Sequence, residues 1–297
     1  MTIVDRPVFV PFGDEALFAI ASEPDTAGPH GVVLLPAGGH TFTPQGNRWA
    51  FDFAHRLAAA GFPTVRFDWQ GIGDSTGVVE TFTLHQPATT EAEAALSILD
   101  TESRVLVGQC YGARTAMAMA DRTEGIGGVA LLAPPVRDFA RGDGTATRQA
   151  YELSTRDFVT QGLRRLSPST LIDRAQLERI GRVGRTLVRA KWRQLTARFR
   201  APDPTPWVSE AFLSQLEGLV RSGVPTLLLY GEEENDYKEF DEARAGKLGE
   251  LLERGSSTVT IEVVPGSAHA AETVEMQQLV VSKVEEWLVG LEAPGAA

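Results

Sequence analysis

Short apolar runs suited to buried strands alternate with helical segments through the first 135 residues. Residues 31–35 form a Gly-Val-Val-Leu-Leu run, which is typical of a strand covered on both faces of a sheet. Residues 49–60 then carry Trp49, Phe53 and Leu57 at helical spacing before Gly61, a common helix terminator. Further strands are expected at 8–10, 17–21, 62–67, 104–107 and 128–132, and further helices at 91–99 and 111–120. This alternation predicts an α/β fold with a mostly parallel sheet and helices on both faces.

The alternation stops near residue 136 and resumes near residue 206. Between these points the sequence has the apolar spacing of helices and no clear buried strand. Beyond it we expect strands at 226–230 and 259–264 and helices at 208–220, 240–252 and 272–288, which completes an eight-stranded sheet. The sequence therefore predicts a core domain made of residues 1–135 and 206–297, with a helical lid insertion at 136–205.

The predicted insertion is strongly basic within an acidic chain. Residues 136–200 contain 14 arginines and one lysine against six acidic residues, whereas the whole chain has a net charge of −11. The arginines either solvate the outer faces of helices or attract an anionic substrate or acidic partner, since a patch of one sign raises encounter rates. The oligomeric state has no signal in the sequence.

The composition argues against several classes of protein. The acidic net charge argues against nucleic-acid binding, and no apolar run reaches the roughly 18–20 residues of a membrane helix. The first residues lack the basic and apolar regions of a secretory signal, and one cysteine allows no internal disulfide, so we expect a cytoplasmic protein. Metal-ligand spacings and nucleotide-binding loops are missing, so no metal or cofactor is expected.

The single cysteine lies between a predicted strand and a predicted helix, in the sequence Gly108-Gln109-Cys110-Tyr111-Gly112. This Gly-x-Cys-x-Gly pattern matches the nucleophile elbow, a sharp turn that holds a nucleophile at the carboxyl edge of a sheet. The helix N-terminus that follows favours negative charge and would stabilise a thiolate. The alternative interpretation is a buried structural cysteine.

A cysteine nucleophile needs a base and an orienting acid. His269 is the one histidine after Cys110, and it follows the last predicted strand. The acid is expected after the strand at 226–230, where Asp236 is our choice because Asn235-Asp236 can turn the loop back. Glu232 and Glu233 are the alternatives for the acid.

Backbone N–H groups and pocket residues complete the predicted site. Tyr111 follows the nucleophile and offers one N–H to an oxyanion, and Gly38 or Gly39 would offer the other. His40, Trp69 and Gln109 are predicted to line the substrate pocket.

Together these residues resemble the α/β-hydrolase superfamily over nearly the whole chain outside the insertion. Leu35-Pro36-Ala37-Gly38-Gly39 resembles the oxyanion loop, although many members have His-Gly where this chain has Pro36-Ala37. The cysteine elbow, the Asn235-Asp236 acid loop and the run from Arg66 to Gly77 are similar to a bacterial cysteine-nucleophile branch, the exosortase-system-associated hydrolases. Dienelactone hydrolases also carry a cysteine nucleophile, but they are smaller and lack such an insertion.

The resemblance implies an enzyme that transfers or hydrolyses acyl groups through an S-acyl intermediate on Cys110, with His269 and Asp236 completing the triad. Thioesters or esters are the expected substrates, and the basic insertion would suit coenzyme A or an acidic acyl carrier protein. A non-catalytic ligand-binding or partner-binding protein on the same scaffold is the alternative, because a fold does not fix a function.

Overall fold

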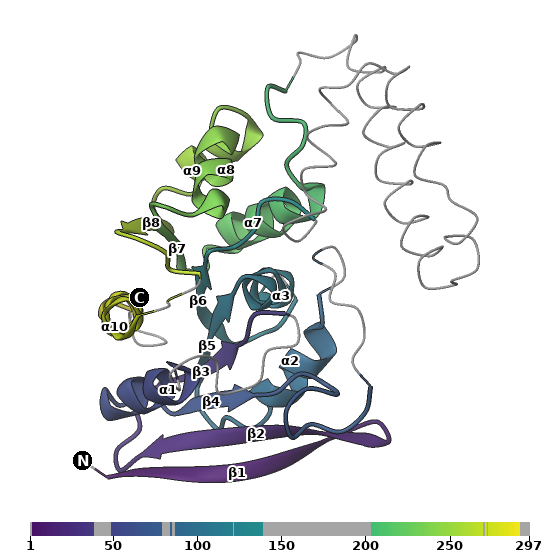
Figure 1. The fold of residues 1–297 in the computed structure, drawn as a ribbon, viewed down its shortest axis with the longest axis vertical. Coiled ribbons are helices and arrows are strands. Elements are labelled where there is room, and N and C mark those ends of the chain that lie inside the picture. Colours follow the sequence, from purple (N-terminus) through teal and green to yellow (C-terminus); the bar gives the residue numbers. More distant parts are fainter. Residues whose placement is uncertain are drawn as a thin grey trace.

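A computed structural model describes residues 2–38, 49–78, 84, 87–120, 122–138, 203–269, 271 and 273–291. These residues form one twisted eight-stranded sheet in the order β1-β2-β4-β3-β5-β6-β7-β8 (Figure 1). The strands are β1 (Ile3–Phe12), β2 (Glu15–Pro24), β3 (His30–Leu35), β4 (Thr64–Phe67), β5 (Ser103–Gln109), β6 (Ile126–Leu132), β7 (Thr226–Gly231) and β8 (Val259–Val264).

The sheet is mostly parallel, which confirms the predicted fold class. β1 and β2 form a long antiparallel hairpin that turns at Gly13 and Asp14, and β2 pairs with β4 in the antiparallel sense. The other neighbouring strands pair in parallel. Since the carboxyl ends of the parallel strands share one edge, the loops after β3, β5, β7 and β8 meet there, where open α/β sheets bind ligands.

Helices cover both faces of the sheet (Figure 1). One face carries α1 (Trp49–Ala59) and α10 (Val274–Val289), whose buried side chains share a cluster with Val32, Val105 and Leu227. The other face carries α2 (Thr89–Leu96), α3 (Tyr111–Ala120), α7 (Glu210–Ser222), α8 (Asn235–Ala243) and α9 (Lys247–Arg254).

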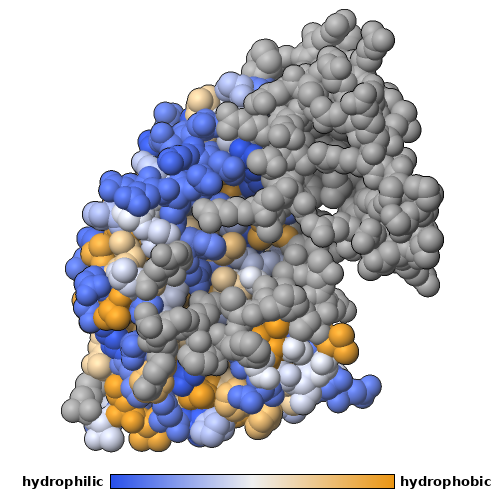
Figure 2. All heavy atoms as spheres, viewed as in Figure 1, coloured by the Kyte–Doolittle hydropathy of each residue, from blue (hydrophilic) through white to orange (hydrophobic). Residues whose placement is uncertain are grey.

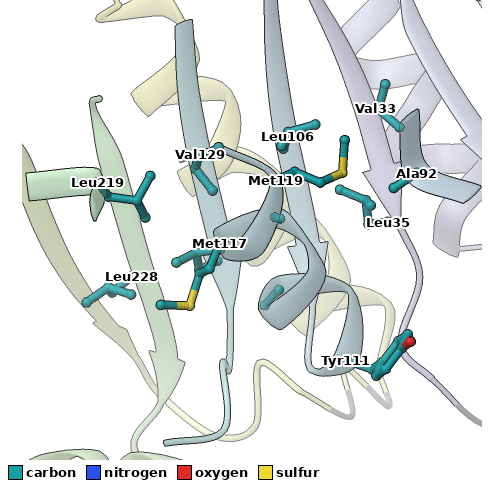
Figure 3. Packing of buried hydrophobic residues seen from close by; sticks show 14 of the residues in the cluster. Val33, Leu35, Ala92, Leu106, Tyr111, Met117, Met119, Val129, Leu219 and Leu228 are labelled. Atoms are coloured by element: carbon teal, nitrogen blue, oxygen red, sulfur yellow. The ribbon is translucent and has the colours of Figure 1, made fainter. Parts of the chain in front are cut away.

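Helix α3 lies at the centre of the larger cluster, and all of its residues are buried. In Figure 3, Met117 lies on the side of Leu228, and Met119 lies on the side of Leu35. The small residues of α3 allow it to lie close to β5 and β6, so the start of this helix is fixed with little freedom to shift.

The predicted helix at 240–252 is wrong in one respect, because two helices occupy this part of the chain. Helix α8 begins at Asn235 and ends at Ala243, and α9 begins at Lys247 after a turn. A Cβ atom at Gly246 would collide with Thr205 and Asp203, so the break lies where another segment packs against the backbone. Asn235 and Asp236 therefore begin a helix and do not form the predicted turn.

Most of the predicted insertion, from residue 139 to 202, lies outside the described residues. Figure 2 shows that the surface over α8 and α9 is largely hydrophilic, in keeping with their many exposed charged residues. Within the described chain, no helix combines the length and the apolar character needed to cross a membrane.

Candidate active site

Cys110 occupies a strained turn between β5 and α3. Its φ of 51° lies in the left-handed region, which residues other than glycine rarely adopt. The Cys110 N–H donates to the Leu132 carbonyl at 2.9 Å, and its carbonyl accepts from the Arg114 N–H at 3.2 Å. The backbone of a nucleophile elbow is therefore present, and Cys110 is only partly buried.

The two glycines that flank the elbow leave no room for a side chain. A Cβ atom at Gly108 would collide with the backbone of Gly112, and one at Gly112 would collide with the carbonyl of Leu35. Strand β3, strand β5 and helix α3 can meet this closely because both positions are glycine.

The predicted oxyanion loop lies against the residue that follows the nucleophile. A Cβ atom at Gly38 would be 2.7 Å from Cβ and Cγ of Tyr111, so the Gly38 backbone packs on the first residue of α3. The Tyr111 hydroxyl accepts a hydrogen bond from the Ala88 N–H at 2.9 Å, which fixes the ring. Gly39 and His40 lie outside the described residues.

Trp69 supports this arrangement from the core. Only 1% of Trp69 is exposed, and its ring meets Tyr111 edge-on at a centroid distance of 5.6 Å. The indole N–H donates to the Pro36 carbonyl at 3.2 Å. Trp69 thus holds the Pro36 loop and Tyr111 together, and its place in the wall of a substrate pocket stays a prediction.

The His269 loop is tied directly to the elbow. The side-chain amide of Gln109, which precedes Cys110, donates to the His269 carbonyl at 2.6 Å. This hydrogen bond joins two residues that lie 160 positions apart in the sequence, so the His269 loop and the elbow lie at the same edge of the sheet. His269 is partly exposed.

Glu234 is a buried residue of this region that the sequence analysis did not single out. One of its carboxylate oxygens accepts hydrogen bonds from the His269 N–H and, at 2.9 Å, from the Ser267 hydroxyl. The other accepts from the Gly231 N–H at 3.0 Å, and only 3% of Glu234 is exposed. Glu234 therefore fixes the His269 loop to the end of β7. Its place in a run of three glutamates gave no signal that this one points inward.

The predicted acid, Asp236, lies in the first turn of α8 and is partly exposed. Burial raises the pKa of Tyr230 well above its usual value, and the negative charges of Asp236 and Glu234 raise it further. Asp236 is therefore near the buried Tyr230 at the end of β7. The alternatives Glu232 and Glu233 are exposed, although their N–H groups donate to Val264 and Gly266 in the loop before His269.

An apolar pocket opens beside the elbow, between α1 and the carboxyl ends of β3 to β6. The space between its walls amounts to about 460 Å³ when the adjoining open solvent is counted, so the enclosed part is much smaller. Gln109 is a polar member of its wall, and the other lining residues are Leu34, Leu35, Pro36, Trp49, Ala50, Phe53, Arg66, Phe67, Val107 and Leu132. Among the described residues, no group of three or more His, Cys, Asp or Glu side chains could hold a metal ion.

Comparison with known proteins places this site in a family. The sequence profile of the alpha/beta hydrolase family matches residues 32–281. A Pyrococcus furiosus esterase, Pf2001, is 14% identical with a TM-score of 0.59, covering 97% of this chain and 91% of its own. The thioesterase domain from the curacin biosynthetic pathway is 17% identical with a TM-score of 0.53, covering 96% and 99%.

A third solved structure, the proline iminopeptidase of Mycobacterium smegmatis, is 15% identical with a TM-score of 0.53 and covers 97% of this chain and 100% of its own. At these identities the solved structures establish the fold alone. No curated protein sequence is detectably similar to the chain.

Replacing Glu234 tests whether its carboxylate holds the His269 loop. In Glu234→Gln, one acceptor oxygen becomes an N–H₂ group that faces a backbone N–H or the Ser267 hydroxyl. We expect the free energy of unfolding to fall by about 2 kcal/mol, the usual cost of an unsatisfied buried polar group. Chemical denaturation of the variant measures this loss.

The matched control is Glu233→Gln, which makes the same substitution at the exposed neighbour. Its free energy of unfolding should change by no more than about 0.5 kcal/mol. Equal effects at the two positions would show that Glu234 has no special part in holding the loop.

Proposed function

Because the chain belongs to the alpha/beta hydrolase family, we propose that it transfers or hydrolyses acyl groups through a covalent intermediate on Cys110. One observation carries the proposal. The only cysteine has the backbone conformation of a nucleophile elbow, and the residue before it is hydrogen-bonded to His269. A structural cysteine would not need a φ of 51°, whereas a nucleophile gains exposure from it.

The proposed reaction proceeds in two acyl transfers. His269 takes the thiol proton, and the Cys110 sulfur attacks the acyl carbonyl to give a tetrahedral intermediate. The C–O or C–S bond to the leaving group then breaks, His269 returns the proton to that group, and a thioester on Cys110 remains. Water or another nucleophile attacks the thioester carbonyl and loses its proton to His269. The C–S bond to Cys110 then breaks, the acyl product leaves, and His269 returns the proton to the sulfur.

Two features of the elbow support stabilisation of the intermediate. The Tyr111 N–H lies at the start of α3, where the helix dipole favours negative charge, and the Gly38 backbone packs against Tyr111. Gly38 or Gly39 would supply the second N–H. We assign Asp236 to orient His269 and to stabilise its protonated ring.

The substrate class follows from the pocket and from charge. The apolar lining beside Gln109 suits an aliphatic acyl chain, and the likeness to an esterase and a thioesterase domain agrees with an ester or thioester. We further propose that the basic residues of segment 136–200 recruit an anionic carrier, either coenzyme A or an acidic acyl carrier protein.

Loss of Cys110 or His269 should abolish turnover. We expect Cys110→Ala and His269→Ala to lower kcat/KM for p-nitrophenyl esters by at least about 10³-fold, the usual effect of removing a nucleophile or its base. His55→Ala is the matched control, because His55 pairs with Asp5 on the hairpin at 2.9 Å. Ester turnover unaffected by Cys110→Ala would place the nucleophile elsewhere, whereas a wild-type protein that binds the ester without turning it over would favour a binding protein.

Filling the apolar pocket should change chain-length preference. Ala50→Leu adds volume to a lining position on α1, so kcat/KM for octanoyl esters should fall by about tenfold while acetyl esters change by less than about twofold. The matched control is Ala59→Leu at an exposed position of the same helix, which should leave both values unchanged. An equal loss for short and long esters would place the acyl chain elsewhere.

Salt concentration should change kcat/KM for acyl groups on anionic carriers more than for acyl groups on neutral carriers. If the basic segment attracts the carrier, kcat/KM for an acyl-coenzyme A should fall steeply between about 0.01 and 0.5 M NaCl, because the Debye length shrinks over this range. The same acyl group on the neutral thiol N-acetylcysteamine should show little change. Parallel salt dependence for the two thioesters would rule out recruitment by charge.

A further inference from the structure

Arg114 is a fully buried charge one helical turn beyond Cys110. It lies on α3, its N–H donates to the Cys110 carbonyl, and none of its side chain is exposed. Its guanidinium donates to the carbonyls of Pro135 and Arg137, both at 3.1 Å. A buried cation is costly unless partners or a function offset its desolvation.

Among the described residues, the carboxylate that pairs with the Arg114 guanidinium belongs to Asp138, which is only partly buried. Asp138 accepts a hydrogen bond from the guanidinium at 3.2 Å, and a quarter of its side chain is exposed. Asp138 also accepts from the Ser209 hydroxyl, which lies 3.2 Å from the guanidinium. The guanidinium carbon lies 5.6 Å from the centre of the Phe212 ring. Solvent screens the aspartate more than the arginine, so the aspartate offsets the buried positive charge only in part.

We propose that Arg114 is a positioning residue whose buried positive charge holds Cys110 as a thiolate, and that Asp138 weakens this effect. The inference rests on the proposed function, since it explains how the nucleophile would be ionised. Burial lowers the pKa of Arg114, and the charges of Asp138, Tyr230 and Cys110 oppose that decrease, so arginine and thiol interact electrostatically. Arginine stays protonated across the range in which a thiol titrates.

The other ionisable groups near the elbow also affect how readily the Cys110 thiol ionises. Tyr230 stays neutral over the working range because its pKa is raised, while the carboxylates of Glu234 and Asp236 beside it disfavour a thiolate. The Tyr111 hydroxyl is hydrogen-bonded to Ala88. Arg137 is a second buried cation of this region, and its guanidinium is paired with Glu239 at 3.0 Å. Arg114 is the cation on α3 itself, and its charge does not change over the pH range in which a thiol titrates.

The test measures the rate of Cys110 alkylation by iodoacetamide against pH, using intact mass. Cys110 is the sole cysteine, so the label reports on it alone. In Arg114→Met we expect the midpoint of the curve of alkylation rate against pH to rise by about one pH unit. The reaction should be about tenfold slower at low pH, and the maximal rate at high pH should not change. Arg114→Lys keeps the charge and should stay within a few tenths of a unit of the wild type.

Asp138→Asn should shift the midpoint of Cys110 alkylation in the opposite direction to Arg114→Met. Asparagine keeps an acceptor oxygen for Ser209 and removes the negative charge, so the midpoint should fall below that of the wild type. Asp138 is partly exposed, so this variant carries the test even if Arg114→Met does not fold. An unchanged midpoint in Asp138→Asn, or equal shifts in Arg114→Met and Arg114→Lys, would overturn the inference.

His269→Ala separates this inference from the proposed function. If it changes the alkylation profile while the charge variants do not, the inference alone fails. An ordinary thiol midpoint near pH 8.5 in the wild type and in every variant would overturn the inference, but it would leave the proposed function intact because His269 takes the proton from a thiol in that reaction.

Discussion

The strained backbone of Cys110 is the constraint on which the rest of the site depends. A φ of 51° in a residue other than glycine costs of the order of 1 kcal/mol and persists only where neighbouring structure fixes it. Here the fixing contacts are the hydrogen bond to the Leu132 carbonyl and the close meeting of Gly108, Gly112 and β3. The sulfur is thereby held at the carboxyl edge of the sheet, and the buried helix α3 prevents the turn from relaxing.

Two hydrogen-bonding side chains then assemble the other loops around this point. Gln109 holds the carbonyl of His269, and Glu234 holds its N–H while also binding the end of β7. Both the carbonyl and the N–H of the proposed base, His269, are thus hydrogen-bonded. Less conformational entropy is therefore lost when its ring is oriented for the reaction. Trp69 and Tyr111 likewise hold residues 36–38, which follow β3.

Much of this arrangement could be predicted because local patterns determine it. Apolar runs gave all eight strands, and the glycine spacing around Cys110 gave the elbow. The division of one predicted helix into α8 and α9 could not be foreseen, because it depends on Thr205 and Asp203 packing against Gly246. The inward direction of Glu234 depends likewise on Ser267 and His269, which lie more than 30 residues away. Interactions between distant segments leave little trace in a local pattern.

Peptide mapping after a rapid quench tests the central claim most directly. The protein is mixed with a slowly hydrolysed acyl ester, stopped in acid within the first turnover and digested. The account predicts one acyl group per chain, carried as a thioester by the peptide that contains Cys110, formed as fast as the alcohol is released. Acyl groups on another residue, or alcohol release without any labelled Cys110, would contradict it.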